Sequence, residues 1–466
     1  MKVLESKIFD FINFVLSKIQ DKTDKIRQNS LILSCIDFFI LAAIVLTFVV
    51  STFASTEIIG MVSSLVPILV VFKTLITKGE KIELETSNFF LLIYLLICFI
   101  SCFTSSMLPQ SLYGFMKTSI YFAFFFAMCQ FLKNNKKYIL SLLAIIALLV
   151  SFESVIGLIQ NSMKLENIST WQDTSYVNPE DVLTRVYGTL KPFNPNLFGG
   201  YLIAGVTSLI GFTTIFAHRK HYKLTSIFLI FSLIAFLTIF LTGCRGAYLA
   251  LGVIFLSILG FSFRLIFVES NNIQIKKIWT SMVSFAGVAA LGFLATHHSI
   301  LQRILSIFIL RGDSSTSFRM NVYNSAIQMF HDNWLCGIGV GNKVFREIYG
   351  LYMLSGFDAL SCYSVPLEIA VESGIFALIF FILFLFVLFK NAIKKVCSCI
   401  NFEEKILLFV SMTSIGAVLI HGIFDTIFFR PQVQFVFWTM VAITTVLVKG
   451  TAKNNENPRV SSESVI

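Results

Sequence analysis

Residues 138–160 read YILSLLAIIALLVSFESVIGLIQ, an apolar run that is interrupted by one acid, Glu153. An α-helix rises about 1.5 Å per residue, so a run of this length crosses the ~30 Å hydrocarbon core of a bilayer. Similar runs recur along the chain and predict about twelve membrane-spanning helices. We expect them at residues 33–52, 57–77, 88–106, 111–131, 138–160, 196–217, 224–243, 246–267, 278–296, 366–389, 406–428 and 432–449.

The composition of the whole chain agrees with this interpretation. Of its 466 residues, 56% are hydrophobic, 13% are charged and 51 are phenylalanine. Charged residues make up about 25% of an ordinary globular chain, so a soluble protein of this length could not bury this much apolar surface. The sequence therefore predicts an all-α, polytopic membrane protein with a transmembrane domain over residues 31–450.

Basic residues are distributed unevenly between the two faces of the predicted bundle. Twelve spans put both termini on one face, and most of the 36 lysines and arginines lie on that face. Because such residues accumulate on the cytoplasmic side, we predict cytoplasmic termini in the cell inner (plasma) membrane. The net charge of +10 then follows from topology and requires no nucleic acid partner.

The two ends of the chain differ from the apolar domain. Residues 1–30 are predicted to form an amphipathic helix that binds membrane lipids at the cytoplasmic surface, whereas the polar residues 451–466 are predicted to be disordered. The apolar positions with helical spacing are Leu4, Ile8, Phe11, Ile12, Val15 and Ile19.

The predicted extracytoplasmic loops are much longer than the cytoplasmic ones, of which 390–405 is the longest inside the domain. Residues 161–195 and 297–365 are the two long loops, and loops beyond about 15 residues tend to be functional or disordered. The second loop is too regularly patterned for disorder, so we expect short helices within it. The working surface is therefore predicted to be extracytoplasmic.

One such helix is expected on the outer surface, with Ile327, Met329, Phe330 and Trp334 as its apolar positions and Gly337 after its end. The glycines of GIGVGN, residues 337–342, lack the strand–turn–helix context of a nucleotide site. We predict that they form a turn.

The stretch RVYGTLKPFNPNLFGGYL, residues 185–202, places turn residues directly before a span. Asn194 and Pro195 interrupt any preceding helix, and Asn194 and Asn196 are the predicted cap residues of the next one. The glycine pair 199–200 allows another helix to approach closely. With Arg185 nearby, this corner is either an anion site at a helix N-terminus or a simple loop-to-helix junction.

Two more arginines occur in similar settings. Arg245 lies in LTGCRGAYLALG between two spans, and Arg319 lies in SSTSFRMNVY at the start of the outer helix. The alternatives are that Arg245 reaches the interface as a snorkelling side chain and that Arg319 is an exposed helix-surface residue. Together with Arg185, the three arginines suit a diphosphate, whose oxygens accept paired guanidinium hydrogen bonds.

Other polar residues in or near the spans are Lys117, Glu153, His421 and Asp425, which mark either functional positions or structural pairs such as Asp425 with Arg430. Neither zinc-type cysteine spacing nor a D-x-D motif occurs in the sequence. We therefore predict no metal site and no cofactor.

Four motifs, in this order, resemble the O-antigen ligase/polymerase family over about residues 180–385. They are RVYGTLKPFNPNLFGGYL, LTGCRGAYLALG, FRMNVYNSAIQMFHDNWLCGIGVGN and YSVPLEIAVESGIFAL. Within that family, ALSCYSVPLEIAVESG and HGIFDTIFFRPQVQFVFW are most similar to the cyanobacterial branch called putative bicarbonate transporters.

The resemblance implies a membrane protein of about twelve spans that moves a glycan from a polyprenyl diphosphate to a glycan or lipid acceptor on the outer face, without metal. It also implies that Arg185, Arg245 and Arg319 hold the donor diphosphate. One position departs from the family pattern, because Tyr363 stands where the ligases carry a histidine. Tyrosine has a pKa near 10 and stays protonated at neutral pH, so Glu368 is the candidate substitute base.

Three functions remain open at this point. The first is glycan transfer from a lipid-linked donor, and the second is a membrane component of inorganic-carbon accumulation. The third is a non-catalytic protein that binds lipid-linked glycan. The outer arginines favour the first, and Tyr363 suits the third.

Overall fold

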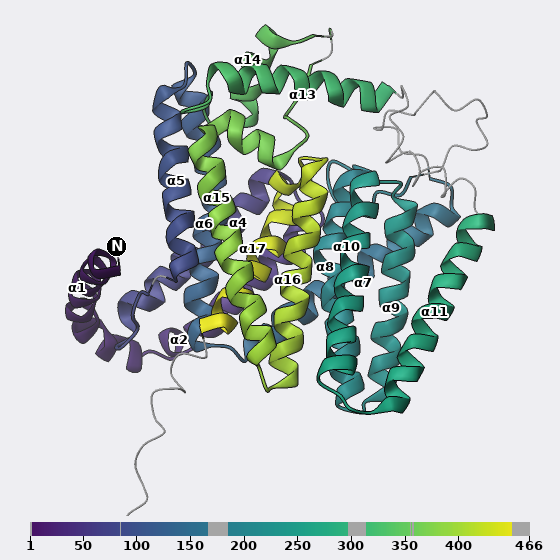
Figure 1. The fold of residues 1–466 in the computed structure, drawn as a ribbon. Helices are drawn as coiled ribbons and strands as arrows, with labels where there is room; N and C mark the ends of the chain where they lie inside the picture. The colour runs from purple at the N-terminus through teal and green to yellow at the C-terminus, as the bar shows by residue number, and fades with distance from the viewer. Residues whose placement is uncertain are drawn as a thin grey trace, which may run out of the picture.

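The computed structural model describes residues 2–83, 85–165, 185–296, 314–354, 356 and 358–449. Within these ranges every regular element is helical, and Figure 1 shows how the helices are arranged. The elements are α1 (Lys2–Gln28), α2 (Leu31–Ser34), α3 (Ile36–Ser51), α4 (Thr56–Ile76), α5 (Thr86–Thr104), α6 (Leu108–Asn134), α7 (Tyr138–Ser162), α8 (Pro195–His218), α9 (Tyr222–Leu241), α10 (Arg245–Phe263), η2 (Arg264–Val268), α11 (Ile273–Thr296), α13 (Ser314–Asp332), α14 (Asn342–Tyr352), α15 (Val365–Ser398), α16 (Phe402–Ile423), η3 (Ile427–Phe429) and α17 (Pro431–Lys449).

The all-α, multi-pass membrane fold predicted from the sequence is confirmed. All twelve predicted apolar runs are helical, and ten of the described helices are long and apolar enough to cross a membrane. The other two predicted spans correspond to α3, which has only 16 residues, and to α11. The first run is shorter than expected because the helix breaks at Cys35, so that its beginning forms the separate α2.

Helix boundaries differ most from the prediction on the side of loop 390–405. That segment is not a long loop, because α15 continues to Ser398 and α16 already begins at Phe402, after the cap residue Asn401. The Asn401 side chain accepts hydrogen bonds from the backbone N–H groups of Glu403 and Glu404, which fixes the start of α16. The predicted tail 451–466 lies outside the described residues.

The centre of the bundle is formed by α8, α16 and α17, of which α17 is the most enclosed. The apolar stretch of α17 is 94% buried, because neighbouring helices such as α6, α8 and α16 surround it. Phe435 contacts Phe124 and Tyr121 of α6, and Trp438 contacts Phe122 and Phe125 of the same helix. A helix that is apolar on every side is a core helix, and α17 fits that description.

Helices α13 and α14 lie across one end of the bundle, where Figure 1 shows them above the start of α15. They form a small hydrophobic cluster of their own that includes Val322, Met329 and Phe345. The predicted outer helix therefore exists, but its buried face was assigned partly wrongly. Ile327 and Trp334 are 54% and 52% exposed, because Val322, Ala326 and Met329 make the inward stripe instead.

Helix α15 has a kink that the sequence did not predict. Gly374 adopts φ +80° inside the helix, and the connection between α13 and α14 packs against the kink. The N–H of Ile375 donates to the carbonyl of Trp334 at 2.8 Å, and the N–H of Gly339 donates to the carbonyl of Glu372 at 3.0 Å. The assigned turn covers residues 333–336, and residues 337–341, with positive φ at all three glycines, form a bent connection that is hydrogen-bonded to α15.

Candidate functional site

Two of the three outer arginines lie on one hydrogen-bonded chain at the α13 end of the bundle. Arg185 donates through Nη2 to Asn196 Oδ1 at 2.5 Å and through Nε to the Thr242 carbonyl at 2.8 Å. Asn196 donates through Nδ2 to Asp425 Oδ2 at 3.0 Å. Arg319 donates to the same Asp425 oxygen at 3.2 Å. The side chains come from positions far apart in the sequence and meet at one carboxylate.

The start of α8 differs in one respect from the prediction. Asn194 is the cap residue, and its side chain accepts from the N–H groups of Asn196 at 2.7 Å and Leu197 at 3.3 Å. Pro195 is the first helical residue, where its missing N–H costs nothing. The prediction that Asn196 caps the helix is wrong, because Asn194 already supplies the cap oxygen. The Asn196 side chain is thereby available to connect Arg185 with Asp425.

The glycine pair of α8 permits the close approach that the sequence predicted. A Cβ atom on Gly199 would lie 3.1–3.3 Å from atoms of Thr242, Ala247 and Cys244, at the start of α10. A Cβ atom on Gly200 would lie 1.7 Å from Ile427 Cδ1. Small residues at this turn therefore bring the starts of α8 and α10 and the segment after α16 together.

The segment before α8 is fixed by two polar side chains of α7. Glu153 accepts from the Thr189 N–H at 3.0 Å and also from the Thr189 hydroxyl. Gln160 donates to the Gly188 carbonyl at 3.0 Å and accepts from the Gly188 N–H at 2.9 Å. Glu153 is thus a structural acid, because its partners are backbone and hydroxyl groups of the segment that carries Arg185.

Arg245 is the first residue of α10 and is half-buried. Its neighbours on both sides contact a fully buried histidine of α16. Cys244 Sγ and His421 Nε2 lie 3.3 Å apart, and a Cβ atom on Gly246 would lie 3.3 Å from the His421 ring. His421 is one helical turn before Asp425, so this contact sets the start of α10 beside the network of Arg185 and Asp425.

Tyr363, which the sequence resemblance placed opposite the histidine of the ligases, lies next to Arg319. The Arg319 guanidinium carbon is 5.7 Å from the centre of the Tyr363 ring. The backbone of Tyr363 has φ +51°, and its carbonyl accepts from the Tyr323 hydroxyl at 3.1 Å. Burial raises the pKa of Tyr363, and the charge of Asp425 raises it further. The hydroxyl therefore stays protonated at neutral pH and cannot act as a general base.

Glu368 lies in the first turn of α15. Its backbone N–H donates to the Ser364 carbonyl at 2.8 Å, and Ser364 itself is extended with φ −156°. The side chain of Glu368 is 2% exposed, and its Oε2 has no hydrogen-bond partner among the described residues. Tyr363 and Ser364 are non-helical, whereas Pro366 lies inside the first turn of α15.

The sequence marked Asp425 either as a functional residue or as the structural partner of Arg430. The structure pairs it with Arg319. The neighbouring Thr426 connects to Ser361 through their hydroxyl oxygens at 3.0 Å, which attaches the segment before α15 to the same corner. An acid at the end of a span was a usable signal, but the sequence does not identify its partner.

The electrostatics of the corner are dominated by Asp425 and Arg319. Burial lowers the pKa of Arg319, but Asp425, Tyr323, Cys244 and Tyr363 together raise it by more, so that the net shift of its pKa is upward. Arg319 therefore remains a cation in this half-buried position. Among the described residues there is no cluster of histidine, cysteine or acidic side chains that could hold a metal ion.

The O-antigen ligase family model matches residues 230–382 of the chain. These residues are similar to an O-antigen ligase domain. The domain includes Arg245, Arg319, Tyr363 and Glu368, whereas Arg185 lies before it and the Asp425 segment follows it. No curated protein matches the chain. The corner described above is therefore assembled by the matched residues together with the segments that flank them.

Proposed function

We propose that this protein transfers a glycan from a polyprenyl diphosphate to an acceptor at the extracytoplasmic face of the cell inner membrane. The observation that carries the proposal is the chain of contacts from Arg185 through Asn196 and Asp425 to Arg319. It concentrates guanidinium groups at the starts of two helices, where backbone N–H groups and the helix dipole also favour an anion. A donor diphosphate has the charge and the oxygens to use this corner.

The proposed reaction is a displacement at the anomeric carbon of the donor sugar. A hydroxyl oxygen of the acceptor forms the new bond to that carbon, while the bond from the carbon to the diphosphate oxygen breaks. The leaving diphosphate keeps the electron pair, and the arginines stabilise the developing charge. The acceptor proton passes to a base, for which Glu368 is the candidate.

Asp425 has a specific place in this proposal. Without a donor, its carboxylate accepts from both Asn196 and Arg319 and thereby keeps these groups in position. A bound diphosphate competes for the same donors, because charge-assisted hydrogen bonds to phosphate oxygens are strong. Asp425 is then a positioning residue for the arginines rather than a group that reacts.

Substitutions at Tyr363 and Glu368 test which residue accepts the proton of the acceptor hydroxyl. In a transfer assay with purified lipid-linked donor, we expect Glu368→Gln to lower the rate by about 10²–10⁴-fold, the range for loss of a general base. Tyr363→Phe should retain most activity, because the hydroxyl is not the base. Tyr363→His should raise the rate, since an imidazole with a pKa near 6.5 accepts a proton at neutral pH. If Glu368→Gln leaves the rate unchanged, the substitute-base assignment is wrong.

A non-catalytic lipid-glycan binder is the second candidate, favoured by the raised pKa of Tyr363 at the family histidine position. The two candidates differ in the assay above. A binder retains donor affinity in the unmodified protein and transfers nothing, and Tyr363→His does not restore transfer.

The proposed orientation is tested by labelling single cysteines from outside the cell in a cysteine-free background. Leu351, in the α14 layer, is 83% exposed, and Ile400, between α15 and α16, is 99% exposed. We expect an impermeant maleimide to label Leu351→Cys and to leave Ile400→Cys unlabelled until the membrane is opened, because the basic residues predict that Ile400 is cytoplasmic. The reverse pattern contradicts the orientation.

A further inference from the structure

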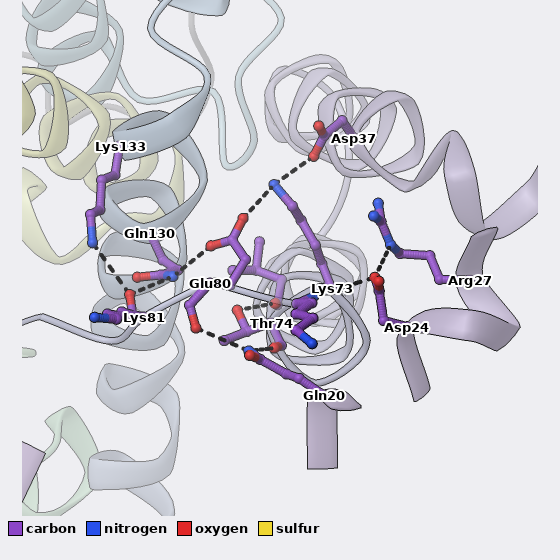
Figure 2. A network of polar contacts seen from close by, with 12 residues as sticks. Gln20, Asp24, Arg27, Asp37, Lys73, Thr74, Glu80, Lys81, Gln130 and Lys133 are labelled. Atoms are coloured by element: carbon purple, nitrogen blue, oxygen red, sulfur yellow. Dashed lines mark hydrogen bonds and ion pairs between the residues drawn. The ribbon is translucent and has the colours of Figure 1, made fainter. Parts of the chain in front are cut away.

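Helix α1 contacts the rest of the protein through polar side chains. Gln20, which is 3% exposed, donates to the carbonyls of Thr74 at 2.8 Å and Glu80 at 3.0 Å, and it accepts from the Gly79 N–H at 3.2 Å. Figure 2 shows this side chain between the end of α4 and the loop that follows. Asn13 exchanges two hydrogen bonds with the backbone of Ile82, at 2.9 and 3.0 Å.

The same polar face continues toward the end of α1. Asp24 accepts from the Lys78 N–H at 3.3 Å and from Arg27 Nε at 3.1 Å, as Figure 2 shows for Arg27. The loop after α4 is held by Lys73, whose ammonium group contacts Asp37 at 2.8 Å and Glu80 of the loop at 3.3 Å. The hydrophilic side of α1 is therefore attached to the end of α4 and to the charged loop that follows it.

The opposite side of α1 is apolar and has no protein partner among the described residues. At 100° per residue, its exposed apolar side chains fall within an arc of about 160°. They are Phe11 at 66% exposure, Ile12 at 38%, Phe14 at 56%, Val15 at 41%, Ile19 at 41% and Ile26 at 64%. A soluble helix that docks on a protein turns its apolar side inward, and α1 does the reverse. The side chains of Leu4 and Ile8 lie outside the described residues.

Charge on the exposed side of α1 is mainly basic. Lys18, Lys22 and Lys25 are exposed among the apolar side chains of this arc, and Lys18 lies 4.4 Å from the centre of the Phe14 ring. The nearby Asp21 is paired with Lys78 at 2.8 Å. Long lysine side chains reach from an apolar face to headgroups, so this side is complementary to an anionic lipid surface.

We propose that α1 is an interfacial helix, held at a fixed depth by its polar face, whose apolar arc enters an anionic leaflet of the membrane. Phe11, Val15 and Ile19 then contact acyl chains, and the three lysines contact phosphate headgroups. The occupant of this surface is the lipid leaflet at the end of α4. The proposal is independent of glycan transfer, because none of these residues belongs to the arginine corner.

The test places a bimane fluorophore on a single cysteine of the full-length protein in nanodiscs. The nanodiscs contain phosphatidylcholine and phosphatidylglycerol with nitroxide-labelled acyl chains. We expect several-fold stronger quenching at Val15→Cys than at Ser17→Cys, a matched exposed position on the other side of the same helix turn. Replacing Lys18, Lys22 and Lys25 together with glutamine should reduce the quenching at Val15 in these anionic nanodiscs.

Two results overturn the proposal. Equal or absent quenching at the two positions shows that the apolar arc does not enter the leaflet. Efficient disulfide formation between two copies carrying Val15→Cys assigns the arc to a second copy of the chain. A Gln20→Ala variant provides the complementary readout, since loss of its three hydrogen bonds should increase hydrogen exchange in α1 while the protein remains folded.

Discussion

Replacing Arg319 with lysine is expected to weaken binding of a polyprenyl diphosphate by roughly 10–100-fold, although the positive charge is retained. Charge-assisted hydrogen bonds contribute about 1.5–3 kcal/mol, and tenfold in affinity corresponds to about 1.4 kcal/mol. An ammonium group cannot reproduce the planar fork of a guanidinium, which contacts two phosphate oxygens at once. The measurement is a titration of the detergent-purified protein with the lipid diphosphate.

The matched control for this experiment is Arg346→Lys. Arg346 lies in α14 of the same outer layer and pairs with Asp358, but both side chains are about half exposed. Exposed pairs contribute little, so binding and stability should be unchanged. If Arg319→Lys binds the diphosphate as well as the unmodified protein does, the arginine corner is not the donor site.

A second comparison separates binding from folding. Arg319→Ala leaves the Asp425 carboxylate, which is only 7% exposed, without its cation. Removing one partner of a buried pair is destabilising, whereas removing both charges is much less so. We therefore expect Arg319→Ala with Asp425→Asn to recover stability relative to Arg319→Ala alone, without recovering diphosphate binding.

Gly374→Ala should be among the most destabilising single substitutions in the chain, by about 3 kcal/mol or more. Gly374 has φ +80°, and an added Cβ would lie 2.2 Å from the Leu335 carbonyl oxygen and 2.6 Å from its carbon. Backbone atoms cannot move aside as the end of a flexible side chain does. Strain at an unfavourable φ and overpacking each cost about 1–3 kcal/mol. The measurement is unfolding in mixed micelles with increasing denaturing detergent.

Gly252→Ala in α10 is the control, because a Cβ there meets nothing within 4 Å. In a helix, alanine is favoured over glycine by about 0.5–1 kcal/mol, so this variant should be neutral or slightly more stable. If Gly374→Ala and Gly252→Ala unfold at the same fraction of denaturing detergent, α15 does not require the kink. The kink matters for the site because the first turns of α15 carry Glu368 and follow Tyr363.

Part of the candidate site could be read from residue types and their neighbours. An arginine beside a Pro–Asn turn, an arginine between two spans and a tyrosine at a motif position are all visible locally. Their arrangement is not local, however. Asp425 connects to Arg319 and Asn196 only because Gly199, Gly200 and Gly246 let three helix ends approach, and no spacing in the sequence specifies that approach.

By itself, the sequence determined that the chain is an all-α, multi-pass membrane protein, because apolar runs of bilayer length have no other stable arrangement. It also indicated that the chain is bent and non-helical at the glycines 337, 339 and 341, because glycine tolerates positive φ. Only the tertiary structure decided that Asn194 rather than Asn196 caps α8, and that α1 turns its polar face inward. Both outcomes depend on which hydrogen-bond partners lie nearby in space, and long-range packing sets those distances.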